Sequence, residues 1–114
     1  MVNEEIFRQL ALSFPDTIEL PHFDKASFRV NKKIFATLDI KNVRACVLLS
    51  EIDQSVFSAF DHAVIYPVPN KWGKKGATFI ELKSVRKDML KDILNQAYLR
   101  ITEAKIKSKG KSKI

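Results

Sequence analysis

Cysteine, glycine and proline are scarce in this sequence: 114 residues include one cysteine, three glycines and four prolines. The single thiol, Cys46, cannot close an intrachain disulfide, so a disulfide-stapled secreted scaffold is excluded. The two histidines and the cysteine show no spacing that resembles a zinc site. A glycine-rich phosphate loop is missing as well, and we therefore expect neither a metal nor a cofactor.

Long apolar runs are also missing. A membrane helix needs about 20 apolar residues, and no stretch of the sequence approaches that length. The N-terminal residues 1–5 are acidic where a signal peptide would be basic. We therefore expect a cytoplasmic protein with no membrane contact, and the length fits one folded domain, residues 1–104.

What the sequence has in excess is positive charge, unevenly distributed. Residues 105–114 hold five lysines and no acid, with almost nothing apolar, which predicts a disordered tail. Within residues 1–104, the stretches 25–44 and 70–91 each carry a net charge of +5, while the remainder carries −8. This segregation by sign is the most informative feature of the composition.

The hydrophobic periodicity predicts a single α+β domain. Asn3, Ser50 and Ser84 are suitable N-caps for helices. We expect the helices at residues 3–13, 51–61 and 84–104, and the strands at residues 27–30, 33–40, 43–49, 63–66 and 77–82. The order α-β-β-β-α-β-β-α predicts a two-layer sandwich, in which the helices pack on a mostly antiparallel five-stranded sheet.

Two connections stand out because they are basic. Asn31-Lys32 can form a tight hairpin turn, since asparagine tolerates a positive φ. Residues 67–76, which contain two prolines and two glycines, are expected to form an irregular loop. The apolar run 43–49 predicts a central strand, with Cys46 in the core.

Several segments together resemble one family over about residues 5–103. They are Ala11-Leu12-Ser13-Phe14-Pro15, Glu19-Leu20-Pro21-His22-Phe23, Phe28-Arg29-Val30, Lys33-Ile34-Phe35-Ala36, Tyr66 to Phe79, and Gln96-Ala97-Tyr98. In this order and spacing they resemble the MmcQ/YjbR family. The resemblance implies a bacterial-type α+β domain, similar in fold to secretion chaperones, with a proposed double-wing mode of DNA binding. It supplies no catalytic residues.

We therefore expect a non-enzymatic domain that binds the DNA backbone through two basic wings. The candidate binding residues are Arg29, Lys32, Lys33, Asn70, Lys71, Trp72, Lys74 and Lys75. For the lysines, the alternative is that they only confer solubility. Trp72 either stacks on a base or folds back over its own sheet. Arg29 either joins the basic face or pairs with Asp39.

Two other classes of function stay open. A protein-interaction module, similar to secretion chaperones and monomeric or homodimeric, would expose an apolar patch. An enzyme or small-ligand binder would need His22, Tyr66 and Trp72 to converge on one pocket. The sequence has no nucleophile motif and no spaced pair of acids, so we expect no enzyme.

Overall fold

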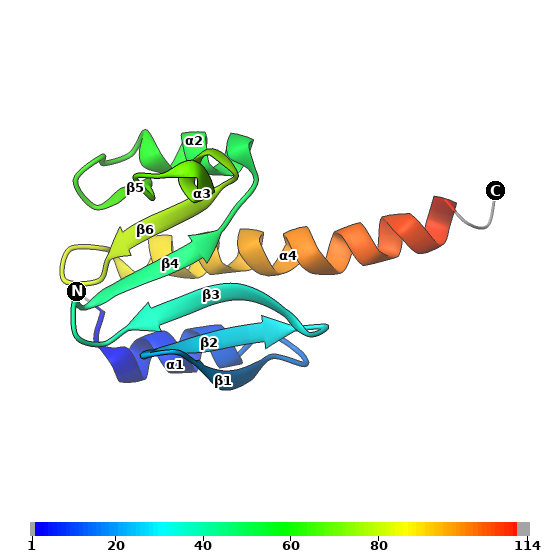
Figure 1. The fold of residues 1–114 in the computed structure, drawn as a ribbon, viewed down its shortest axis with the longest axis horizontal. Coiled ribbons are helices and arrows are strands. Elements are labelled where there is room, and N and C mark those ends of the chain that lie inside the picture. The colour runs from blue at the N-terminus through cyan, green and yellow to red at the C-terminus, as the bar shows by residue number, and fades with distance from the viewer. Residues whose placement is uncertain (1, 112–114) are drawn as a thin grey trace.

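A computed structural model describes the backbone of residues 2–111 and the side chains of residues 2–103. The elements, in chain order, are α1 (Glu4–Leu12), β1 (Ile18–His22), β2 (Lys25–Val30), β3 (Lys33–Asp39), β4 (Arg44–Leu48), α2 (Glu51–Ser58), β5 (Ile65–Pro67), α3 (Lys71–Lys74), β6 (Ala77–Glu81) and α4 (Lys87–Lys111). Figure 1 shows their arrangement.

The strands form one antiparallel sheet in the order β1-β2-β3-β4-β6-β5. The α+β class is confirmed, and β4 lies inside the sheet as its apolar sequence predicts. The expected count of five strands is wrong, because β1 precedes the predicted first hairpin. The predicted element order is therefore also wrong, and α3 is a further element within the expected loop 67–76.

Both edge strands contain a proline, Pro21 in β1 and Pro67 in β5. Proline lacks the N–H that an inner strand must donate, but an edge strand has a side without a partner. The proline-containing segment 18–22 reads as a connection from sequence alone, and the edge position explains why it is a strand nonetheless.

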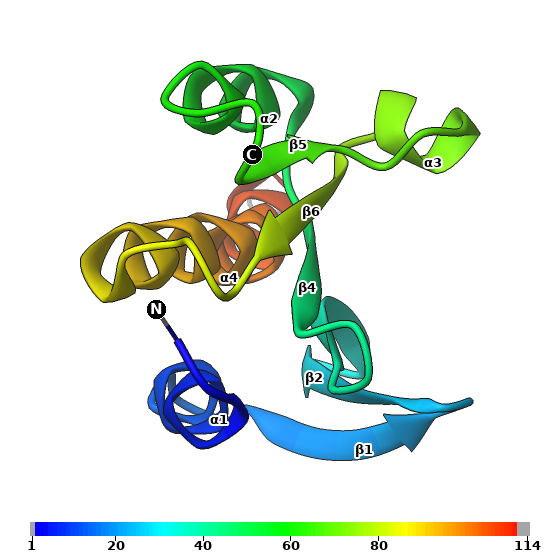
Figure 2. The same cartoon turned by 90° about the vertical axis from the view of Figure 1, so that its left-hand side faces the viewer.

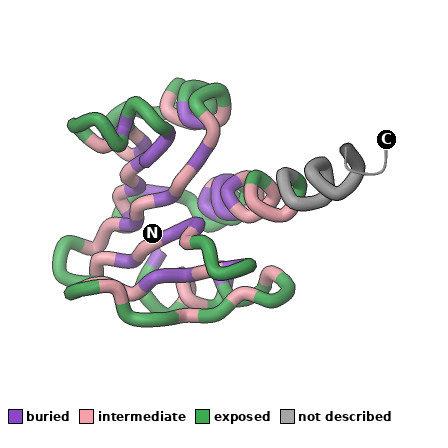
Figure 3. The backbone as a smooth tube through the Cα atoms, turned by 45° about the vertical axis from the view of Figure 1, so that its right-hand side comes forward, coloured by how far each residue is buried: buried purple, intermediate pink, exposed green. Residues whose placement is uncertain are grey.

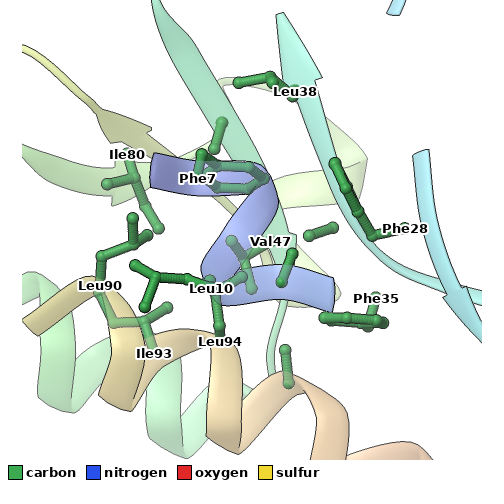
Figure 4. Close-up of a cluster of buried hydrophobic side chains, with 14 of the residues drawn as sticks. Phe7, Leu10, Phe28, Phe35, Leu38, Val47, Ile80, Leu90, Ile93 and Leu94 are labelled. Atoms are coloured by element: carbon green, nitrogen blue, oxygen red, sulfur yellow. The ribbon is translucent and has the colours of Figure 1, made fainter. Parts of the chain in front are cut away.

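Helices α1 and α4 cover one face of the sheet, and the opposite face, here called the open face, has neither of them (Figure 2). The core lies between the two layers. Figure 4 shows Phe7 and Leu10 of α1 and Leu90, Ile93 and Leu94 of α4 meeting the strand side chains Phe28, Phe35, Leu38, Val47 and Ile80. Buried residues gather at this interface, whereas the connections are exposed (Figure 3).

Capping residues set the starts of the first two helices. The Asn3 side chain accepts a hydrogen bond from the Ile6 N–H at 2.8 Å, and Ser50 accepts one from the Asp53 N–H at 3.1 Å. Each satisfies an amide that the helix itself leaves without a partner. Both caps are those that the sequence predicts.

Helix α4 continues past the end near residue 104 that the sequence predicts, to Lys111. The side chains after Glu103 and residues 112–114 lie outside the described residues. The disorder predicted for residues 105–114 therefore stays a prediction. Within the described part of the chain, no helix is both long enough and apolar enough to cross a membrane.

Candidate nucleic-acid interface

The first basic projection is the turn between β2 and β3. Asn31 and Lys32 both have positive φ, 52° and 66°, the combination that a two-residue hairpin turn of the right twist requires. The predicted turn is confirmed. It leaves Asn31, Lys32 and Lys33 exposed beyond the end of β2.

The second basic projection is the short helix α3. Its N-cap is Asn70, whose Oδ1 accepts a hydrogen bond from the Trp72 N–H at 2.8 Å. The irregular loop expected here is wrong in this respect: a proline-bounded segment with an asparagine cap forms one helical turn. A helix of four residues is too short to show a periodic pattern in the sequence.

Two glycines let this segment pack tightly. A Cβ on Gly73 would lie 1.8 Å from the carbonyl oxygen of Val68, and a Cβ on Gly76 would lie 1.8 Å from that of Leu49. Gly76 also has a φ of +109°, which side-chain-bearing residues rarely adopt. The α3 turn is thus held closely against the strand backbone on both sides.

Gln54 of α2 holds the α3 turn in place through side-chain hydrogen bonds. Its buried Nε2 donates to the carbonyl oxygens of Gly73 at 2.8 Å and Ala77 at 3.1 Å, and to the hydroxyl of Thr78 at 3.2 Å. Gln54 is not among the residues predicted from the sequence to belong to the site. The spacing of the apolar residues gives no signal for it, because Ile52 and Val56 lie on the opposite side of the helix.

Trp72 projects from this turn and is 58% exposed. The alternative in which it folds back over its own sheet is therefore wrong. Lys71 and Lys75 lie close to it, with their Nζ atoms 5.8 and 5.6 Å from the centre of the indole ring. The ring is thus an exposed aromatic surface within a basic cluster.

Both projections lie at the same end of the sheet. β2 ends where β3 begins, and β4 ends at Leu48, which pairs with Ala77 at the start of β6. Because β4 and β6 each run antiparallel to their neighbour, the start of β3 and the start of β6 share one end. β3 and β6 are two strands apart, which corresponds to about 10 Å at the usual strand spacing.

The lysines of the two projections are exposed: Lys32, Lys33, Lys71, Lys74 and Lys75. Among the residues whose side chains are described, none of these five takes part in an ion pair. Their charge is therefore not neutralised within the molecule.

Arg29 lies on the open face, as expected from its position opposite Phe28 and Val30. Its Nε donates to the hydroxyl of Ser27 at 3.0 Å. Pairing with Asp39 is wrong, because Asp39 lies at the other end of β3 and pairs in register with Arg44. Arg29 instead sits opposite Ile34, near the β2–β3 turn.

The rest of the open face carries charges of both signs. Asp39, Arg44 and Glu81 lie side by side in register on β3, β4 and β6. The guanidinium carbon of Arg44 stacks 3.9 Å from the centre of the Phe79 ring. Tyr66 donates its hydroxyl to Glu81, and that hydrogen bond raises the pKa of Tyr66. Acids and bases alternate along this row, so it favours a polyanion far less than the α3 turn does.

Cys46 belongs to the open face rather than to the core. It is partly exposed and pairs in register with Thr37 and Phe79. Its assignment to the core is wrong because the inward positions of β4 are those of Ala45 and Val47. Burial nevertheless raises the pKa of the Cys46 thiol, which lowers its reactivity near neutral pH.

His22, Tyr66 and Trp72 do not form a pocket. His22 lies in β1 and Tyr66 in β5, which are opposite edges of the six-stranded sheet. The described side chains include no group of three or more histidine, cysteine or acidic residues that would hold a metal ion. The hypothesis of a small-ligand site at these three residues is therefore wrong.

The fold and these projections define a class: a small α+β domain with a half-covered antiparallel sheet and two basic protrusions at one end. The sequence model of the YjbR family matches residues 12–100, and the chain belongs to that family. The crystal structure of Deinococcus radiodurans protein DR2400, which contains a DUF419 domain, is similar in fold. The TM-score is 0.76 at 20% identity, over 90% of this chain and 80% of that one. No curated protein matches the chain.

Proposed function

We propose that this protein is a non-enzymatic, cytoplasmic DNA-binding protein that contacts the phosphate backbone at the end of the sheet bearing its two basic projections. The main observation in its support is that Lys32 and Lys33 share that end of the sheet with Lys71, Lys74 and Lys75. All five side chains are exposed, and none takes part in an ion pair among the described residues. Lysines in such positions bind phosphates by releasing counterions, which gives affinity without sequence reading.

The spacing of the projections supports a duplex as the partner. The β2–β3 turn and the β5–β6 connection that contains α3 are centred three strand spacings apart, which corresponds to about 14 Å and is comparable to the width of about 12 Å of the major groove. The two clusters are therefore far enough apart to contact phosphates on both sides of one groove. Arg29, on the open face near the first turn, adds a further positive charge.

Trp72 and Asn70 have separate roles in this proposal. Asn70 holds the turn in place through its hydrogen bond to the Trp72 N–H, so it acts as a positioning residue. The exposed indole of Trp72 supplies stacking area against an unpaired base or a sugar edge. Its substitution by alanine is expected to weaken binding without changing the number of phosphate contacts.

The salt dependence of binding tests the proposal. In the full chain, the triple change Lys71→Gln, Lys74→Gln and Lys75→Gln removes three exposed charges. We expect the slope of log affinity against log salt to fall by about 2 to 3 units, at about 0.9 per lost phosphate contact. The measurement is fluorescence anisotropy of a labelled duplex across a salt titration.

The matched control neutralises three exposed lysines elsewhere: Lys83→Gln, Lys87→Gln and Lys91→Gln. Lys83 follows β6 and therefore lies at the opposite end of the sheet from the α3 turn. This control has the same net charge as the first variant, and its slope is expected to stay near that of the unmodified protein. Equal slopes in the two variants would remove the α3 turn from the mechanism.

A further inference from the structure

Helix α2 buries a polar side chain and exposes apolar ones, which is the reverse of an ordinary surface helix. Its buried residue is the polar Gln54, whereas Ile52, Val56 and Phe60 are 77%, 52% and 65% exposed. Ile52 and Val56 are four residues apart, and Phe60 follows in the turn that ends the helix, so the three share one side. We call these three residues the α2 stripe. A surface helix normally turns such a stripe toward the core.

Folding does not explain this orientation. The sheet-facing side of α2 is satisfied by the three hydrogen bonds of Gln54 and by the partly buried Phe57. The α2 stripe contributes nothing to that contact. Three large apolar side chains grouped on an exposed helix are typical of a surface that another molecule covers.

The charges around the α2 stripe indicate what covers it. Residues 45–70 contain no lysine or arginine, whereas Glu51, Asp53 and Asp61 lie in or next to α2. Glu51 and Asp61 are exposed and flank the α2 stripe at its two ends. The patch is thus apolar in the middle and acidic at its rim.

This charge pattern disfavours two of the candidate occupants. A second copy docking α2 against α2 would bring acids against acids in either orientation, and like charges in contact oppose association. An anionic membrane surface would likewise be repelled. A helix with an apolar stripe and a rim of lysine or arginine complements both features of the patch.

We propose that the α2 stripe with its acidic rim is a docking site for a basic amphipathic helix of a partner protein. The apolar side chains of the partner would pack on Ile52, Val56 and Phe60, and its lysines or arginines would lie near Glu51 and Asp61. The α2 stripe lies on the side of α2 away from Gln54, so it is a separate surface from the lysines of the α3 turn, which Gln54 contacts on the other side.

The probe is a synthetic fluorescent 18-residue peptide of leucine and lysine, patterned as an amphipathic helix, with a scrambled peptide of the same composition as reference. Binding to the full chain is measured by anisotropy. The triple change Ile52→Ser, Val56→Ser and Phe60→Ser is expected to weaken binding about tenfold or more. Reversing the rim by Glu51→Lys and Asp61→Lys is expected to weaken it about fivefold or more.

The matched control changes three exposed apolar residues elsewhere: Ile18→Ser, Leu20→Ser and Ile40→Ser, which are 53%, 40% and 49% exposed. This control is expected to keep the affinity within about twofold. If the variant with all three stripe residues changed is unstable, the single change Ile52→Ser replaces it in the test. That side chain is 77% exposed, so its substitution has little effect on folding. The salt slope for DNA is expected to be the same in all these variants.

Three results would overturn the proposal. The first is equal peptide affinity for the stripe variant and the control, or equal affinity for the patterned and scrambled peptides. The second is a dimer, seen by sedimentation, that the stripe variant abolishes, which would assign the surface to a second copy. The third is binding to phosphatidylserine vesicles that depends on the α2 stripe. If the full chain does not bind DNA but binds the patterned peptide through the α2 stripe, the proposed DNA-binding function is contradicted and the docking site is not.

Discussion

Single residues stabilise the connection between β3 and β4. The Asn42 side chain donates to Asp39 Oδ2 at 2.7 Å, and the Asn42 backbone N–H donates to Asp39 Oδ1 at 3.2 Å. These bonds favour the ionised carboxylate and lower the pKa of Asp39. The turn also contains Val43 at a φ of 51°, an unusual value for a β-branched residue. Asp39 thus holds a strained turn in place.

The change Asn42→Ala is expected to lower the free energy of unfolding by about 1 kcal/mol near pH 6, because it removes the first of these bonds. Asp39 has a depressed pKa when folded, so its contribution is present above the unfolded pKa of about 3.9 and is lost as the pH falls through the folded pKa. The difference between the two proteins should therefore shrink on acidification below about pH 4.

Urea denaturation at a series of pH values measures this difference. The change Asn31→Ala is not a suitable control, since Asn31 has a positive φ, whereas the exposed Lys41→Ala leaves both bonds to Asp39 in place. A pH-independent difference for Asn42→Ala would show that the carboxylate of Asp39 is not the group stabilised.

At the scale of elements, α2 and α3 form one unit through Gln54. The Gln54 side chain reaches from α2 to one carbonyl oxygen within α3, that of Gly73, and to one just after it, that of Ala77. The position of Trp72 therefore depends on a helix about 20 residues earlier in the chain. The basic turn is therefore held by buried polar contacts rather than by apolar packing.

The change Gln54→Leu keeps the volume and removes the side-chain amide that donates to Gly73, Ala77 and Thr78. We expect it to lower the free energy of unfolding by about 2 kcal/mol, because buried carbonyl groups lose hydrogen bonds. Amide hydrogen exchange in Lys71–Gly76 should accelerate more than exchange in α1, since only the former depends on Gln54. Ser55→Ala, at an exposed position on the same helix, should change stability by less than about 0.5 kcal/mol.

Elements with a local signal were predictable from sequence, and those fixed by tertiary context were not. The caps Asn3 and Ser50 and the turn at Asn31 each satisfy a backbone requirement within a few residues, so α1, α2 and the β2–β3 hairpin follow from them. In contrast, the edge position of Pro21 is set by distant pairing. The same is true of the orientation of α2, because the spacing of Ile52 and Val56 predicts a helix but not which side meets the sheet.

The candidate site was predictable in part for the same reason. Exposed lysines at connections follow from composition, and their placement at one end of the sheet follows from strand order, which the sequence does not reveal. The exposure of Trp72 could not be predicted, because it depends on the contact of Gly73 with Val68.

At the scale of the whole molecule, positive charge collects at one end. Helix α4 runs toward the end of the sheet where β2 stops, the end that also carries the two projections (Figure 1). The sequence places five lysines in residues 105–114, after most of that helix. The tail and the projections would therefore approach a polyanion from the same end, although they belong to separate parts of the chain.

Removal of residues 105–114 is expected to reduce the salt slope of DNA binding by up to about 4.5 units, since it removes five lysines at about 0.9 per lost phosphate contact. The Lys71, Lys74 and Lys75 triple change should alter the free energy of DNA binding by the same amount with and without residues 105–114, within about 0.5 kcal/mol, because separate sites act additively. A double-variant cycle measures this. An effect of the triple change that vanishes in the shortened chain would show that the α3 turn contributes to DNA binding only together with the tail.

The prolines of the two outermost strands bear on the behaviour of the protein at high concentration. A sheet with free margins can grow by adding strands from neighbouring copies, which leads to fibrils. Pro21 and Pro67 each remove a donor from one margin and interrupt the row of amides that an incoming strand would need. The sheet is thereby protected against fibrillar growth at both margins, and at the β5 margin helix α2, which contacts that strand, adds to the protection.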